Sequence, residues 1–263
     1  MGSLTRNAAL RVLLLGGTGE ASRLAACLAR DDRFDTTLSL AGVTQSPMLS
    51  PVPCRIGGFG GTDGLCAWLR AECIEAVIDA THPYAQRISA NARYATEAAG
   101  VPLLRIERAP WRPQPGDRWT LVPDADAAAA AIGPVPLRVL LTVGSKSLAA
   151  FRAAPQHHYV IRCIDPPDPS LLPPHAELLL ARGPFALAAE AALLANRHIA
   201  RLVSKNSGGD ATGAKLAACR NAGIPVVMID RPDSVSGAAP TDPLAWLLAL
   251  HRDRPPQPCE RGA

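Results

Sequence analysis

Lysine is scarce in this chain, since only three of its 27 basic residues are lysine, and aromatic residues make up only 4% of it. No cluster of basic residues alternates with aromatic ones, which argues against a groove for nucleic acid. No apolar run approaches the roughly 18 residues that span a bilayer, and no signal-cleavage pattern precedes the first glycine-rich turn. We therefore expect a soluble, cytoplasmic protein that binds neither nucleic acid nor a membrane.

Patterns of metal ligands are absent as well. The seven cysteines are scattered, and none forms a CxxC or Cys/His pair with the spacing of a zinc site. The sequence thus predicts no metal ion, and cysteines that are reduced and mostly buried. The formal charge of +4 is modest for 263 residues, so a small anion suits the chain better than a polyanion.

The three lysines, Lys146, Lys205 and Lys215, lie in or directly after turns rich in glycine, serine and threonine: TVGSKS, SKNSGG and ATGAK. Where arginine is used almost throughout, a remaining lysine can mark a position that needs a compact ammonium group rather than a planar guanidinium. The alternative is that composition drifted towards arginine, with Lys146 and Lys215 as solvated helix residues.

Apolar runs alternate with Ala/Leu-rich segments of helical period, which is the pattern of a parallel sheet covered by helices. Strands are predicted near residues 11–15, 36–41, 52–56, 75–80 and 101–106, and again near 137–142, 157–162, 176–181, 199–204 and 224–229. Helices are predicted near residues 19–30, 62–71, 84–99, 145–152, 184–197, 211–222 and 241–251. The Pro-rich segment ERAPWRPQPGDRW connects two predicted domains, 1–123 and 124–252, and a disordered tail follows at 253–263.

The second set of elements repeats the first. AAGVPLLRIER (98–108) matches NAGIPVVMIDR (221–231) at an offset of 123 residues, and RVLLLGG matches RVLLTVG at an offset of 127. The sequence therefore predicts an α/β protein of two Rossmann-like, doubly wound parallel-sheet domains. Ligands of such sheets bind beyond the carboxyl ends of the strands and between domains, so we expect the active site in the cleft between the two.

The first glycine-rich turn, GGTGEAS, follows a predicted strand and opens a helix, where backbone N–H groups can bind a pyrophosphate. Its spacing departs from GxGxxG, because Ser22 stands where the third glycine is expected. A plain strand-to-helix turn is the alternative. The residues predicted to bind cofactor here are Gly16, Gly17, Thr18, Gly19 and Glu20.

The end of the second strand, Leu40-Ala41-Gly42, lacks the acidic residue that binds the adenosine 2′-hydroxyl of NAD. Its absence favours a 2′-phosphate, and Arg55 in CRIGGFGG is the nearest candidate partner. The sequence thus favours NADPH, bound also by Ala41, Gly42, Gly58 and Phe59.

The segment DATHPYAQ follows the fourth strand, where a nicotinamide would lie. Asp79 and Thr81 can bind the cofactor, and His82 and Tyr84 can donate a proton. Each residue alone has a structural alternative: a helix cap for Asp79, a turn for His82 and the core for Tyr84.

In the second domain, TVGSKS, ARGPF and SKNSGG occupy the equivalent strand ends. Hydroxyls, amides and a glycine-rich turn make a receptor for carboxylate or phosphate, and cations add to it. The predicted ligand-binding residues are Lys146, Arg182, Lys205, Asn206, Ser207 and Gly208.

The motifs GGTGE, RIGGFGG, DATHPYA, RIERAPW, TVGSK, RGPF and SKNSGG, in this order, resemble those of the precorrin-6A reductase family of cobalamin biosynthesis. The resemblance covers residues 11 to about 231. It implies reduction of one C=C bond of the tetrapyrrole precorrin-6A by a pyridine nucleotide, with hydride going to C19 and a proton to C18, to give precorrin-6B. It also implies that Lys146, Arg182, Lys205 and the SKNSGG amides hold carboxylates of the substrate.

We expect Tyr84 to be the proton donor, with His82, Lys205 and water as alternatives. The alternatives for function are a cobalt-precorrin-6A reductase and a non-catalytic NADPH-sensing protein. A reductase or epimerase of extended short-chain type ranks behind them, since it needs a Tyr-x-x-x-Lys pair and no tyrosine here has lysine four residues on. The sequence is compatible with a monomer and leaves the oligomeric state open.

Overall fold

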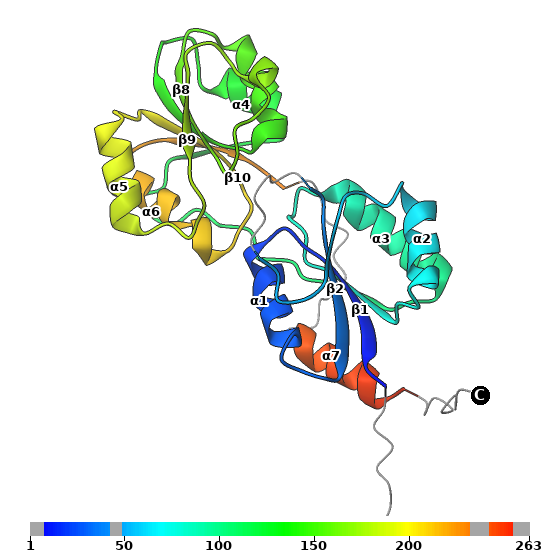
Figure 1. The fold of residues 1–263 in the computed structure, drawn as a ribbon. Coiled ribbons are helices and arrows are strands. Elements are labelled where there is room, and N and C mark those ends of the chain that lie inside the picture. Colours follow the sequence, from blue (N-terminus) through cyan, green and yellow to red (C-terminus); the bar gives the residue numbers. More distant parts are fainter. Residues whose placement is uncertain (1–7, 43–48, 232–241, 255–263) are drawn as a thin grey trace, which may run out of the picture. The chain divides into compact units, whose positions relative to one another are not determined.

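The computed structural model describes residues 8–42, 49–231 and 242–254. The chain divides into two compact units, one of residues 1–107 together with 235–263 and one of residues 108–234 (Figure 1). Each unit contains its own parallel sheet with helices on both faces, as the alternating sequence pattern predicts.

The sheet of the first unit has five parallel strands within the described residues, in the order β3-β2-β1-β4-β5. The strands are β1 (Leu10–Leu15), β2 (Phe34–Leu40), β3 (Cys54–Ile56), β4 (Ala76–Asp79) and β5 (Leu103–Arg105). The helices are α1 (Gly19–Leu28), α2 (Thr62–Ala71), α3 (Gln86–Ala99) and α7 (Pro243–Arg252).

The sheet of the second unit has six parallel strands in its described part, in the order β6-β11-β10-β7-β8-β9. The strands are β6 (Trp119–Val122), β7 (Arg138–Thr142), β8 (His158–Cys163), β9 (Ala176–Leu180), β10 (Arg201–Lys205) and β11 (Val226–Ile229). The helices are α4 (Ala125–Ala131), α5 (Leu187–Asn196) and α6 (Ala214–Asn221), with 3₁₀ helices η1 (Ser145–Ala153), η2 (Pro169–Leu171) and η3 (Asp210–Thr212).

The two sheets share one strand order. If β7 to β11 are numbered from one to five, both sheets read 3-2-1-4-5, and β6 adds an edge strand to the second. This confirms the predicted doubly wound repeat. The order reverses between β1 and β4 in one sheet and between β7 and β10 in the other, which is where such sheets bind ligands.

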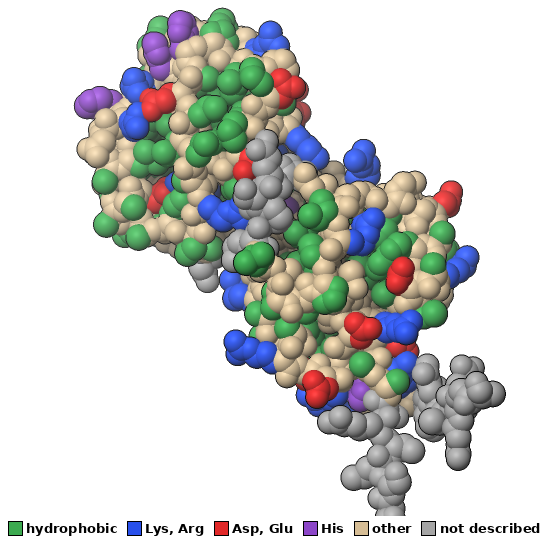
Figure 2. All heavy atoms as spheres, in the orientation of Figure 1, with side chains coloured by type: hydrophobic (Ala, Val, Ile, Leu, Met, Phe, Trp, Pro, Cys, Tyr) green, Lys and Arg blue, Asp and Glu red, His purple; other side chains and the backbone are tan. Residues whose placement is uncertain are grey.

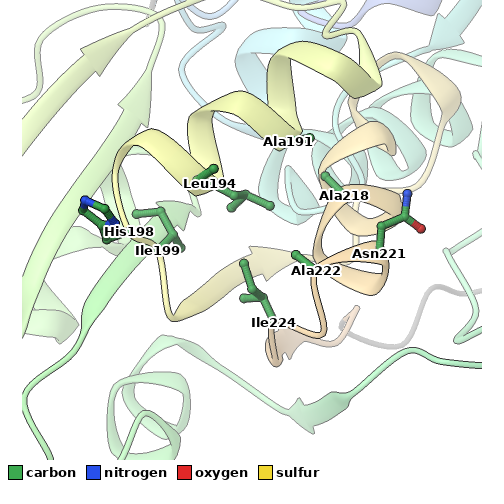
Figure 3. Close-up of a pocket in the computed structure, with 9 residues that line it drawn as sticks. Ala191, Leu194, His198, Ile199, Ala218, Asn221, Ala222 and Ile224 are labelled. Atoms are coloured by element: carbon green, nitrogen blue, oxygen red, sulfur yellow. The ribbon is translucent and has the colours of Figure 1, made fainter.

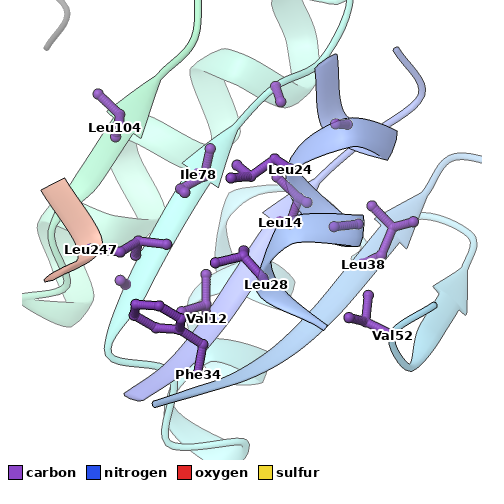
Figure 4. Packing of buried hydrophobic residues seen from close by; sticks show 14 of the residues in the cluster. Val12, Leu14, Leu24, Leu28, Phe34, Leu38, Val52, Ile78, Leu104 and Leu247 are labelled. Atoms are coloured by element: carbon purple, nitrogen blue, oxygen red, sulfur yellow. The ribbon is translucent and has the colours of Figure 1, made fainter. Parts of the chain in front are cut away.

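In the first unit, successive side chains of the buried strands pack into two apolar clusters on opposite faces of the sheet. Val12, Leu14 and Ile78 face one cluster with α1, whereas Leu13 and Val77 face another with α2 and α3. Successive side chains of a strand point to opposite faces, so a strand covered on both sides is apolar throughout. Figure 4 shows the first of these clusters from close by.

Helix α7 corrects the predicted domain boundaries. Leu247 is fully buried in the cluster of β1, β4 and α1, so this helix belongs to the first unit although the sequence assigns it to the domain 124–252 (Figure 4). The first boundary also moves, from 123 to between Glu107 and Arg108, because β6 pairs with β11. Of the predicted tail, Arg254 bonds the Ala8 carbonyl and pairs with Glu75, and residues 255–263 lie outside the described part.

Three further details differ from the prediction. Strand β6 and helix α4 are additional elements, and the helix predicted near 145–152 is the 3₁₀ helix η1. The expectation of mostly buried cysteines is wrong in part, because Cys27, Cys54 and Cys73 are exposed. Among the described helices, none is long and apolar enough to cross a membrane.

Candidate functional site

The carboxyl end of β1 passes into a turn that its own sequence shapes. Gly16 N–H donates to the Ser39 carbonyl at 2.9 Å, and Gly17 has a φ of +106°, which side-chain-bearing residues rarely adopt. Thr18 caps α1 by accepting from Ala21 N–H at 3.2 Å, and its hydroxyl donates to the Ala80 carbonyl at 2.7 Å. The turn is thereby fixed beside the carboxyl end of β4.

This turn fits a pyrophosphate. The first N–H groups of a helix have no partner within the helix, and they carry the positive end of its dipole. Apart from its two chain neighbours, no described residue has an atom within 4 Å of the position that a Cβ of Gly17 would take, so a ligand can approach the backbone there. The carboxylate of Glu20 is held by Arg23 at 3.2 Å on the first turn.

Arg55 occupies the carboxyl end of β3, two strands or roughly 10 Å from β1. Its guanidinium donates to Ser39 Oγ at 3.1 Å and to the carbonyls of Gly57 and Gly58 at 3.0 Å each. It also stacks on the Phe59 ring, with Cζ 3.7 Å from the centroid, and partial burial lowers its pKa. Arg55 therefore organises the glycine-rich loop while placing a positive charge beside the end of β2, which ends at Leu40 and is followed by Ala41 and Gly42.

Asp79, at the end of β4, is only 2% exposed, and its carboxylate is used within the protein. It accepts from the Thr81 hydroxyl at 2.6 Å and from Thr81 N–H at 3.0 Å, and Arg105 Nη1 lies 3.8 Å away. These contacts give Asp79 and Thr81 a structural role in shaping the DATHPYA turn. Arg105, which the sequence prediction missed, joins β5 to this network.

His82 and Tyr84 lie together on the same turn, with ring centroids 5.6 Å apart. Tyr84 N–H donates to His82 Nδ1 at 3.3 Å, so that nitrogen is an acceptor and the ring proton of the neutral imidazole is on Nε2. Both side chains are half-buried, which leaves each able to meet a ligand.

The lysine-bearing turns of the second unit meet at the carboxyl ends of adjacent strands. Lys146 follows β7 and Lys205 ends β10, and these strands pair in register. Burial, and then the like charge of Lys146, lowers the pKa of Lys205 below its ordinary value. A bound anion would relieve this repulsion, so the pair suits a carboxylate.

The SKNSGG turn is held from behind by Arg231. The guanidinium donates to the carbonyls of Asn206 and Ser207 at 2.8 Å each and to that of Arg108 at 2.5 Å. Gly208 has a φ of +66°, and a Cβ there would stand 2.1 Å from the Ala109 carbonyl oxygen. The sequence prediction missed Arg231, although the internal repeat aligns it with Arg108.

Asn206 has a structural role beside the predicted binding role. Its side-chain oxygen accepts from Trp111 N–H at 2.8 Å, and its amide donates to the Trp111 carbonyl at 3.2 Å. The Trp111 indole donates to the Gly209 carbonyl at 3.1 Å, which ties the connecting segment to the far end of the turn. The sequence prediction missed these contacts of Trp111.

Arg182 is exposed in the turn after β9, the edge strand two strands from β7. The same turn carries Phe185, whose ring lies against the Arg162 guanidinium with Cζ 4.0 Å from the centroid. Arg162 pairs with Glu190 of α5. The three cationic residues Lys146, Lys205 and Arg182 thus belong to one edge of the second sheet.

Within the described residues, no group of three or more histidine, cysteine, aspartate and glutamate side chains could hold a metal ion. Figure 2 shows histidines on the surface of the second unit. The rings of His158 and His175 are 5.1 Å apart, but the nearby Glu177 carboxylate pairs with Arg138 and Arg197.

A groove of about 540 Å³ lies between α5 and α6, lined by residues such as Leu194, Ala218 and Ile224 (Figure 3). His198 and Ile199 precede β10 and Ile224 precedes β11, so the groove is at the amino ends of the strands. It contains none of the predicted site residues.

A sequence model described as precorrin-6x reductase CbiJ/CobK matches residues 11–248. The chain is 51% identical to the precorrin-6A reductase of Rhodobacter capsulatus over 84% of this chain and 88% of that protein. It is 31% identical to the cobalt-precorrin-6A reductase of Salmonella typhimurium, over 84% and 87% of the two chains.

A solved structure described as CobK precorrin-6A reductase matches with a TM-score of 0.86 and 48% identity, covering 92% of this chain and 97% of that one. Both the sequence and the two-sheet fold therefore agree with one family over nearly their whole length. This chain belongs to the precorrin-6x reductase CbiJ/CobK family.

Proposed function

We propose that this chain reduces precorrin-6A to precorrin-6B with NADPH in cobalamin biosynthesis. The observation that carries the proposal is the contrast between two edges of like topology: a glycine-rich turn without lysine or arginine beside β4 in one sheet, and a pair of lysines beside an amide-rich turn in the other. We call these the first edge (16–20, 41–42, 55–61 and 79–84) and the second edge (143–147, 181–185 and 205–209).

The first edge would hold the cofactor. The amides of Gly17 to Glu20 would bind the pyrophosphate, and Arg55 would meet the 2′-phosphate, which fits the absence of an acidic residue at the end of β2. When bound, NADPH supplies the hydride that reaches C19 of the macrocycle. Thr18 and Asp79 would hold the glycine turn and the DATHPYA turn in a fixed relation.

The second edge would hold the substrate. Lys146, Lys205 and Arg182 would pair with acetate and propionate carboxylates, and the backbone around Ser207 and Gly208 would add N–H donors. Charge-assisted hydrogen bonds are worth roughly 1.5–3 kcal/mol each, so a few of them orient a large flexible ligand. Catalysis would come chiefly from placing the ring carbon against the nicotinamide.

Tyr84 would give the proton to C18. Its ring lies beside His82, whose proton-bearing Nε2 is the first alternative donor. Lys205 is the second, since its lowered pKa makes the ammonium a stronger acid.

The metal-free substrate is favoured over its cobalt-bearing form. Support comes from the 51% identity with a precorrin-6A reductase, against 31% with a cobalt-precorrin-6A reductase over the same share of this chain.

The test is to follow the absorbance of NADPH with purified protein, alone and with precorrin-6A or cobalt-precorrin-6A. We expect oxidation that requires a tetrapyrrole and is faster with precorrin-6A. Binding of NADPH without oxidation in the presence of either substrate would point to a sensing protein and contradict the proposal.

A further inference from the structure

Three charged residues are buried in the described part of the second unit, on β8, α5 and α6. Lys215 of α6 is 4% exposed, Arg162 of β8 is 8% exposed and Glu190 of α5 is 2% exposed. Arg162 pairs with Glu190, whose other oxygen, Oε2, is buried and accepts no hydrogen bond from the described residues. Removing three charged groups from water costs free energy, so we expect a functional reason for their burial.

Two aromatic side chains connect these charges to the turns of the second edge. Lys215 Nζ lies 4.8 Å from the ring centroid of Trp111, which bonds Asn206 and Gly209. The Arg162 guanidinium lies 4.0 Å from the ring centroid of Phe185, in the turn that carries Arg182. Lys215 thus contacts a ring that is bonded to the SKNSGG turn, and Arg162 contacts a ring that belongs to the ARGPF turn.

The two turns are also joined to each other. Phe185 N–H donates to the carbonyl of Ala211 at 3.2 Å, and Ala211 lies two residues after the SKNSGG sequence. Lys215 is the second residue of α6 and lies three residues after the end of η3, so it is close in the chain to this junction.

Lys215 is the titratable member of the cluster. Burial lowers its pKa to about 7, and the Arg162 charge acts in the same direction, while the Glu190 charge opposes it. Burial also raises the pKa of the Cys219 thiol to about 12, so the thiol stays neutral. The ammonium that faces Trp111 is therefore present below about pH 7 and is lost above it.

We propose that Lys215 is a positioning residue for substrate binding: its ammonium group, held between Trp111 and the Arg162–Glu190 pair, fixes the SKNSGG turn and the ARGPF turn in the arrangement that receives the tetrapyrrole carboxylates. The inference rests on the proposed function and deepens it. Lys215 touches neither substrate nor cofactor in this account, and acts through Trp111.

The central variant is Lys215→Met, which keeps the length of the side chain and removes its charge. We expect the KM for precorrin-6A to rise roughly three- to 30-fold at a pH below 7, the range of a desolvated cation–π contact, with kcat changed little. The Kd for NADPH should not change, and the melting temperature should stay the same or rise, because a buried charge is replaced by an apolar group.

Lys215→Arg is the matched control, since it stays charged at every pH. In the wild type the KM should rise as pH passes upward through about 7. Lys215→Arg should keep the low KM on both sides of this pH, and Lys215→Met should keep the high one. The pKa of Lys205 is also lowered, so Lys205 can contribute to the rise in KM with pH. Only the part of this rise that is absent in Lys215→Arg is therefore assigned to Lys215.

Trp111→Leu provides an independent variant if Lys215→Met fails to fold. It should raise the KM by a similar factor, and the double variant should show no further increase. A wild-type KM in both single variants, or a rise in KM only together with a lower melting temperature and weaker NADPH binding, would overturn the inference. Failure of the wild type to oxidise NADPH with precorrin-6A would instead overturn the proposed function.

Discussion

The two sheets end in edges that share a topology and differ in chemistry. After β1 stands GGTGE, fixed to the neighbouring strand end by a threonine hydroxyl, and after β7 stands VGSKS, facing a second lysine on the neighbouring strand end. A glycine-rich turn at a helix N-terminus can bind phosphate through backbone N–H groups, whereas two neighbouring ammonium groups favour a bound anion, because it lowers their mutual repulsion. The same architecture thus carries two turns of different chemistry, and the proposed division between cofactor and substrate is based on this difference.

The means of rigidity also differ between the edges. At the first edge the side chains of Thr18, Asp79 and Arg55 fix the turns by bonding backbone carbonyls or a neighbouring hydroxyl. At the second edge one arginine, Arg231, bonds three carbonyls from beneath the turn. Substitutions that act on only one edge can therefore test which ligand each edge binds.

The largest expected effect concerns the origin of the proton. Tyr84→Phe, at the first edge, should lower the single-turnover rate of precorrin-6A reduction by about 10²–10⁴-fold, the usual contribution of a general acid. His82→Gln is the matched control and should have a smaller effect. An unchanged rate across pH in Tyr84→Phe would remove this tyrosine from the mechanism and direct attention to Lys205, at the second edge.

The next effect compares one glycine from each edge. Gly208→Ala forces a Cβ to within 2.1 Å of a backbone oxygen at a left-handed φ, so precorrin-6A binding should weaken about ten- to 100-fold. Gly17→Ala meets no atom within 4 Å and carries only the conformational strain of its φ of +106°. Calorimetric titration should show the first variant deficient in precorrin-6A binding, and the second deficient in NADPH binding alone.

A smaller effect is expected at Arg55. Arg55→Met should weaken NADPH binding by about tenfold, because a charge-assisted hydrogen bond to the 2′-phosphate is lost. NADH, which lacks that phosphate, serves as the control ligand and corrects for any disturbance of the loop that Arg55 holds. Equal losses for NADPH and NADH would assign Arg55 to loop structure alone.

The smallest expected effect is on the pH dependence of the melting temperature, and it concerns a residue of the second unit. His157, fully buried in the second unit, has a pKa lowered by burial and by the Arg201 charge, against a hydrogen bond with the Gly133 backbone. The unfolded chain therefore takes up a proton near pH 6.5 that the folded chain resists, so stability is full above this pH and declines as pH falls below it. His157→Gln should flatten this decline in the melting temperature, and an unaltered slope would contradict the assignment.

Most of the fold could be predicted from the sequence because its central strands are buried on both faces. Strand β11 (VVMI) is therefore an unbroken apolar run, and β1 (LRVLLL) is apolar except at Arg11; a glycine turn follows β1. Strand β6 lies at a sheet edge with Leu121 exposed, and α4 is nearly all alanine, so neither shows a clear period. Helix α7 has an apolar face, but nothing in that face tells which sheet it covers.

The site could be predicted only where the type of residue by itself indicates the chemistry. The glycine turn and the lysines did so, and their contributions to ligand binding stay predictions. The bonds of Arg231 to three carbonyls could not be predicted, nor could the burial of the Lys215 ammonium against indole, although the sequence singles out Lys215 as one of three lysines. Both depend on contacts between segments far apart in the chain. For Asp79, the sequence predicts a contact with the cofactor, whereas in the structure its carboxylate binds Thr81 and lies near Arg105.

The most direct test of the account is a titration of the Lys205→Met protein with NADPH and with precorrin-6A. If the first edge binds cofactor and the second binds substrate, precorrin-6A should bind about ten- to 100-fold more weakly than to the wild type, through the loss of one charge-assisted contact, and NADPH should bind unchanged. Weakened NADPH binding with unchanged precorrin-6A binding would contradict the account.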